Sequence, residues 1–94
     1  VVRLYDVRAD GTLGPWRPFA TFGGQGTPDG MKIAVDGSVW VALAHAGIVR
    51  VFNADGSHRR DIPVPLPLVT SLCFGSDGSF QVFIALYGKC QNTL

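Results

Sequence analysis

A chain of 94 residues is the size of one small domain, and it buries too little surface to form a large core without a partner. Hydrophobic residues make up 47% of it and charged residues 16%, with twelve glycines and six prolines, which is typical of a folded, turn-rich chain and not of a disordered one. The formal net charge of +1 comes from scattered basic residues, so the composition excludes an electrostatically driven binder of nucleic acid or of anionic membranes.

The strand pattern begins at Val2 and continues along nearly the whole chain. The first strand alternates over residues 2–6 and leads to a hairpin turn at Asp10-Gly11. Residues 39–43 are β-branched, aromatic and apolar, which predicts a strand buried on both faces. Turns are expected at the Asp-Gly pairs, and the proline-rich segment 63–68 marks a connection. No helix is required, and the further strands are expected at 16–22, 31–35, 39–43, 48–52, 59–64, 70–74 and 80–87.

Two pairs of segments show an internal repeat. "VRLYDVRADG" at 2–11 is similar to "VRVFNADG" at 49–56, an offset of 47 residues at their first members. "MKIAVDGSVWVAL" is similar to "SLCFGSDGSFQVFIAL", and their Asp-Gly pairs are 41 residues apart. Such offsets with four short strands per period indicate β-propeller blades, with a β-sandwich as the alternative. The sequence therefore predicts an all-β propeller fragment of about two blades over residues 1–94: an outer half-blade 1–22, a complete antiparallel four-stranded blade about 30–63, and an inner half-blade about 69–87.

The cysteines, the lack of a long apolar stretch and the N-terminus indicate the compartment of the protein. Cys73 and Cys90 belong to no C-x-x-C motif and have no histidine at ligand spacing, which favours two free thiols over a disulfide or half a zinc site. No apolar stretch approaches the roughly 18 residues that span a bilayer, and the N-terminus lacks a signal-peptide pattern. These features favour a cytoplasmic protein that does not enter membranes. Because the chain begins with Val1 inside an expected strand, we expect the sequence to start partway through a longer reading frame.

The stretch "GTPDGMKIAVDGSVWVAL", followed by "GIVRVFNADG" and "PLVTSLCFG", resembles the C-terminal half of the senescence marker protein, regucalcin and gluconolactonase family. Paraoxonases and diisopropylfluorophosphatase are more distantly similar. The resemblance covers about Val2 to Gly75, and its most specific part is the motif at 28–31 with Gly37 and Trp40. It implies a six-bladed propeller with a divalent metal ion in its channel, calcium foremost, with zinc, manganese or magnesium as alternatives. The implied activity is metal-dependent hydrolysis of sugar lactones or related esters.

The family resemblance implies that Asp29, in Pro28-Asp29-Gly30-Met31, is a metal ligand and candidate general base. An inner strand of a propeller lines the channel, so a carboxylate just ahead of the strand at 31–35 sits where blades converge and can hold a hard cation. A metal polarises a lactone carbonyl, and a carboxylate can take the proton of an attacking water. The alternative is that Asp29 is an ordinary Asp-Gly turn residue. We predict that Asp29 is the site and Asp36 the turn.

Several positions depart from the family pattern or remain open. Ala34 stands where the family usually has a second carboxylate. Lys32 fits either a channel-side cation or a solvated lysine, and His45 fits either a contact to a sugar hydroxyl or an exposed loop residue. Trp40 is expected to pack between blades, and Trp16 to be a core or interblade contact.

The remaining ligands of the family belong to segments that this chain lacks. One carboxylate offers too few of the roughly six to eight oxygens that calcium takes, so we expect weak metal binding and no catalysis by the chain alone. Two hypotheses follow. The chain is part of a metal-dependent lactonase-like hydrolase, or it is a non-catalytic propeller fragment that binds a partner or itself through blade edges, with three copies closing a six-bladed ring.

Overall fold

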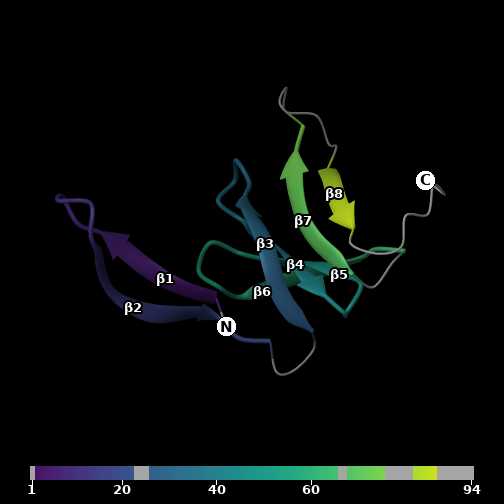
Figure 1. Cartoon of the computed structure of the whole chain (residues 1–94), viewed down its shortest axis with the longest axis horizontal. Helices are drawn as coiled ribbons and strands as arrows, with labels where there is room; N and C mark the ends of the chain where they lie inside the picture. The colour runs from purple at the N-terminus through teal and green to yellow at the C-terminus, as the bar shows by residue number, and fades with distance from the viewer. Residues whose placement is uncertain (1, 23–25, 66–67, 76–81, 87–94) are drawn as a thin grey trace.

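The computed structural model describes residues 2–22, 26–65, 68–75 and 82–86, and these residues contain strands and no helix. The strands form three antiparallel sheets, which lie side by side in chain order with the four-stranded sheet in the middle (Figure 1). The first sheet pairs β1 (Val2–Val7) with β2 (Leu13–Ala20), the second has the order β3 (Thr27–Ile33), β4 (Val39–Ala44), β5 (Ile48–Phe52) and β6 (His58–Pro63), and the third pairs β7 (Val69–Phe74) with β8 (Val82–Leu86). The predicted all-β class is confirmed.

Three Asp-Gly pairs close hairpin turns by the same local chemistry. In each, the aspartate carboxylate accepts hydrogen bonds from the backbone N–H and the hydroxyl of the residue two positions on, at 2.9–3.0 Å and 2.6 Å. The following glycine has a φ of 86–91°, a conformation that side chains disfavour. The pairs are Asp10-Gly11, Asp36-Gly37 and Asp55-Gly56. The predicted turn at Asp77-Gly78 lies outside the described residues.

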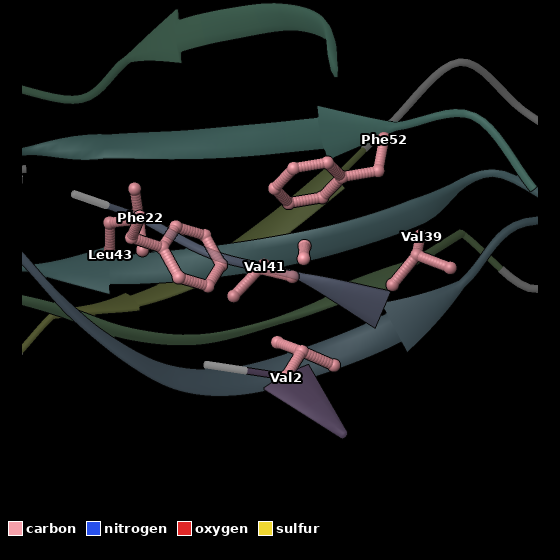
Figure 2. Packing of buried hydrophobic residues seen from close by; sticks show 7 residues of the cluster. Val2, Phe22, Val39, Val41, Leu43 and Phe52 are labelled. Carbon is pink, nitrogen blue, oxygen red and sulfur yellow. The ribbon is translucent and has the colours of Figure 1, made fainter. Parts of the chain in front are cut away.

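Strand β4 lies at the centre of the packing because it is buried on both faces, as predicted. Its side chains alternate, and Val41 and Leu43, both fully buried, pack with Val2 and Phe22 from the first half of the chain. Figure 2 shows this cluster, in which the ring of Phe52 meets that of Phe22 edge to face with centroids 5.6 Å apart. Burial of these apolar side chains holds the β1–β2 sheet against the four-stranded sheet.

The opposite face of β4 packs against the third sheet. Ala42 joins Val69 and Leu72 of β7 in a second buried cluster, and the Trp40 ring meets the Phe74 ring edge to face at 5.1 Å between centroids. Trp40 therefore packs between neighbouring sheets, as predicted. Trp16 does not, because it remains 47% exposed on β2.

The inner strand β3 differs from its prediction at both ends. It begins at Thr27 and ends at Ile33, whereas the sequence pattern predicts a strand at 31–35. Pro28 is accommodated because β3 is an edge strand of its sheet, where a missing N–H breaks no ladder bond. Val35 lies beyond the strand and is fully exposed. Asp29 is consequently inside a strand and not ahead of one.

Candidate metal and catalytic site at Asp29

Asp29 and Gly30 form a β-bulge in the inner strand. Pro28 pairs with Leu43 and Met31 with Val41, so three steps along β3 correspond to two along β4. One extra residue in a strand disrupts the alternation of side chains and redirects the bulged residue. The pair Asp29-Gly30 therefore serves a different purpose from the three Asp-Gly turns described above.

Gly30 is required at the bulge because the next sheet approaches it closely. A β-carbon placed on Gly30 would lie 2.7 Å from the hydroxyl oxygen of Ser71 and 2.8 Å from the carbonyl oxygen of Thr70. Gly30 does not have a positive φ, so its role is to admit the β7 backbone and not to adopt a left-handed turn. Strands β3 and β7, the first strands of adjacent sheets, lie close together (Figure 1), and they meet at Gly30, the residue after Asp29.

Strand β7 carries a matching irregularity at the same level. Val69 pairs with Leu86 and Ser71 with Ala85, so β7 also gains one residue relative to its partner. By the internal repeat, Thr70 of β7 occupies the position that Asp29 occupies in β3. The bulge is therefore a repeated feature of the inner strands, and what distinguishes β3 is the carboxylate.

The Asp29 carboxylate is exposed, and no hydrogen bond or ion pair to it is found among the described residues. The other described aspartates are all engaged, either in the Asp-Gly turns or in ion pairs. Hydrogen bonds from Ser38 and from Arg59 hold the pKa of Asp36 well below its usual range. Asp61 accepts two hydrogen bonds from Arg50, and these, with a smaller contribution from His58, lower its pKa to about 2. Among the described aspartates, Asp29 is the one left available for a ligand.

Other candidate positions lie around this end of the sheet or away from it. Thr27 pairs with Ala44, so the bulge is near the β4–β5 turn, in which His45 is exposed with a φ of 70°. Lys32 is exposed further along β3. Contacts of either side chain with a substrate remain predictions.

Ala34 is placed away from Asp29. Its N–H donates to the carbonyl of Ser38, and its carbonyl accepts from Gly37, so it belongs to the turn that joins β3 and β4. Five residues of extended chain span roughly 15 Å, which is too far for residues 29 and 34 to share one ion. Ala34 is therefore part of the turn and does not lie beside Asp29.

The described residues fit a metal ion only in part. They contain no cluster of three or more His, Cys or Asp side chains that could hold one. Asp29 can supply at most two oxygens, whereas a calcium site takes roughly six to eight. Cys73 is a free, exposed thiol on β7 and provides no soft-metal alternative, since Cys90 lies outside the described residues. The chain offers one well-placed ligand and not a complete site.

Three antiparallel sheets in chain order, with the middle one packed against both neighbours and β3 beside β7, define the chain as a portion of a β-propeller. The structure is similar to that of luciferin-regenerating enzyme, with a TM-score of 0.81 and 26% sequence identity, over 89% of this chain and 29% of that one. The chain belongs to the SMP-30/gluconolactonase/LRE-like family, whose model matches residues 1–87. The family resemblance and the propeller fold predicted from sequence are thereby confirmed.

Curated relatives are similar at low identity. Regucalcin of Danio rerio is 28% identical over 81 residues, which are 85% of this chain and 28% of that protein. Pentonolactonase XacC of Haloferax volcanii is 33% identical over 63 residues, which are 67% of this chain and 22% of that protein. The chain thus spans less than a third of the length of these relatives. No helix in the described part of the chain is both long and apolar enough to cross a membrane.

Proposed function

We propose that this chain carries one active-site carboxylate of a metal-dependent hydrolase that opens sugar lactones or related esters, with Asp29 as metal ligand and general base. The observation that carries the proposal is the exposed Asp29 carboxylate, held on a bulge between two inner strands and engaged by no described residue. Family membership supports it, and so does similarity to a protein named for pentonolactone hydrolysis.

In this proposal the two carboxylate oxygens of Asp29 have different roles. One oxygen would hold the cation, for which calcium is the first candidate and zinc, manganese and magnesium the alternatives. The other would accept the proton of the water that attacks the lactone carbonyl. When bound, the cation would supply Lewis acidity for that carbonyl. The close contact of Gly30 with β7 fixes the bulge, which limits the motion of the carboxylate between these two tasks.

A second candidate is a non-catalytic propeller fragment that binds a partner through its sheet edges. It is favoured by one observation: the described residues supply a single ligand where a metal site needs several. In this case Asp29 is a remnant of a site and its loss has no consequence for binding.

The test compares Asp29→Asn with Asp55→Asn in the purified protein, in whatever assembly it forms. Asp55 is the matched control because it also precedes a glycine but accepts hydrogen bonds from Ser57 in a turn. Lactone hydrolysis releases a proton, so a pH-stat follows it directly, and calorimetry measures calcium binding separately.

We expect Asp29→Asn to lower the hydrolysis rate by about 10²–10⁴-fold, the usual contribution of a general base, and to weaken calcium binding. Asp55→Asn should leave both unchanged. Equal hydrolysis and equal calcium affinity in the two variants would refute the assignment of Asp29. A parent protein that neither binds calcium nor opens lactones would refute the enzyme proposal and leave the second candidate.

A further inference from the structure

The irregular pairing of β7 gives Ser71 an unusual position in its strand. Val69 and Leu72 are three residues apart and would face opposite sides of a regular strand. Both are nevertheless buried in the cluster that packs against β4, because one extra residue lies between them. Thr70 and Ser71, which separate the two buried residues, are themselves only half-buried. The bulge therefore keeps Ser71 out of the core of its own sheet, on the part of β7 that meets β3.

The Ser71 hydroxyl is close to Asp29 in space. Its oxygen would be 2.7 Å from a β-carbon on Gly30. With a C–C bond of about 1.5 Å, the same oxygen is at most about 4.2 Å from the Gly30 α-carbon. Consecutive α-carbons are about 3.8 Å apart, so the hydroxyl oxygen is within about 8 Å of the Asp29 α-carbon. One small ring can thus contact both side chains.

The hydroxyl and the carboxylate offer complementary hydrogen-bonding groups. No hydrogen bond to the Ser71 hydroxyl is found within the described parts of the chain, and the same holds for the Asp29 carboxylate. In contrast, Ser38 and Ser57 donate to the aspartates of their own turns. A serine hydroxyl both donates and accepts, whereas an ionised carboxylate accepts only. The two groups together suit a ligand that presents hydroxyls beside a polar reacting centre.

We propose that Ser71 binds the hydroxyl group next to the carbonyl of the lactone, which makes the site selective for α-hydroxy lactones, the class that includes sugar lactones. This inference rests on the proposed function of Asp29. A base at Asp29 acts on the water that attacks the carbonyl carbon. The hydroxyl on the neighbouring ring carbon is the substituent closest to that carbon, and Ser71 is the nearest described hydroxyl across the contact between β3 and β7. A lactone without this substituent leaves Ser71 unpaired and binds less tightly.

The first test measures binding and requires no hydrolysis. Lactams have the ring and carbonyl of lactones but an unreactive amide bond, so γ-butyrolactam and its α-hydroxy derivative are the probes. In NMR titrations of the purified protein with calcium present, the parent should bind the α-hydroxy lactam about 3–10-fold more tightly, the effect of one hydrogen bond. Ser71→Ala should bind the two lactams equally. A parent that binds neither lactam or both equally would overturn the proposal, and so would a Ser71→Ala protein that keeps the preference.

Ser57→Ala is the matched control. Ser57 belongs to the turn between β5 and β6, where it donates to Asp55, so its loss should leave the preference of the parent unchanged. The readout is the ratio of the two affinities, because a loss of stability lowers both affinities together. A merely structural role of Ser71 would therefore not change this ratio.

Hydrolysis of the matching lactones separates this inference from the proposed function. In a pH-stat, Ser71→Ala should lower kcat/KM about 3–10-fold for α-hydroxy-γ-butyrolactone, mainly through KM, and leave kcat/KM for γ-butyrolactone unchanged. A Ser71→Ala protein that opens both lactones with the preference of the parent would overturn the role of Ser71 and leave the hydrolase proposal intact. A protein that shows the Ser71-dependent preference for the α-hydroxy lactam but opens neither lactone would refute only the hydrolase proposal.

Discussion

Replacement of Gly30 by alanine tests whether the close approach of β3 and β7 holds the bulge that carries Asp29. The new β-carbon would lie 2.7 Å from Ser71 Oγ, 2.8 Å from Thr70 O and 2.9 Å from Ser71 Cα. Ordinary contact begins at 3.4 Å, so the two strands must separate by about half an ångström to relieve the overpacking. The carbonyl and the α-carbon belong to the backbone and cannot rotate away.

Overpacking of this kind costs about 1–3 kcal/mol, and we expect Gly30→Ala to lower the free energy of unfolding by about 2 kcal/mol. In a chain of this size each kcal/mol shifts the melting temperature by about 4–8 °C, which predicts a drop of roughly 8–16 °C. The same separation moves the backbone of Asp29, so any metal affinity that the protein shows should fall in parallel.

The assay is urea denaturation followed by tryptophan fluorescence at fixed protein concentration. Gly14→Ala is the control, because its β-carbon would meet only Asp6, at an ordinary 3.5 Å or more, and should change stability by less than about 0.5 kcal/mol. Ser71→Ala in the Gly30→Ala background removes one obstruction of three and should restore little. A Gly30→Ala protein as stable as the Gly14→Ala protein, or one fully rescued by Ser71→Ala, would refute the role of the β7 backbone.

Three further predictions concern the stability of the sheets around the site, and in each the free energy of unfolding is measured by chemical denaturation. Leu43→Ala empties a fully buried position in the main cluster and should cost about 2–5 kcal/mol; a loss below about 1 kcal/mol would contradict its central place. Ser38→Ala removes the hydroxyl that accepts from the Trp40 indole N–H at 2.9 Å, and we expect a cost of about 1–3 kcal/mol, whereas no cost would mean that another acceptor replaces it. Arg50 lowers the pKa of Asp61 to about 2 in the folded chain, so the ion pair stabilises the fold above about pH 4 and this is lost as the pH falls towards 2. With the Asp61 side chain 33% exposed, the ion pair contributes about 1 kcal/mol. The difference in stability between the parent and Asp61→Asn should therefore shrink steadily between about pH 4 and pH 2; a difference independent of pH would exclude the ion pair as its cause.

The position of the candidate site follows from the sequence only in part. The motif and the repeat together predict Asp29 just ahead of an inner strand at 31–35, whereas in the structure β3 begins at Thr27 and contains Asp29. No local sequence pattern predicts the contact between Ser71 and Gly30, because the two residues are 41 positions apart in sequence and meet only when the sheets pack. Aligning the two repeats identifies Thr70 and Ser71 as the matching inner-strand residues, and this is the signal that could have pointed to them.

Three of the four Asp-Gly pairs that the structure describes show what the sequence by itself determined. At Asp10, Asp36 and Asp55 a serine or threonine two positions on supplies both donors, and a glycine supplies the left-handed conformation, so each turn is complete within a few residues. Alternating apolar residues likewise determined the strands, because a strand buries one face or both. These interactions are local, and local sequence is sufficient to predict them.

The fourth pair, Asp29-Gly30, was decided by tertiary structure. Here the residue two positions after the aspartate is Met31, which has no hydroxyl to donate, and β3 continues through the dipeptide as a bulge. The glycine is needed because the backbone of a neighbouring sheet lies against it, and the aspartate is left without a described partner for the same reason. The packing of two inner strands thus decides whether the aspartate of an Asp-Gly pair closes a turn or is available to bind. The dipeptide by itself does not encode this packing.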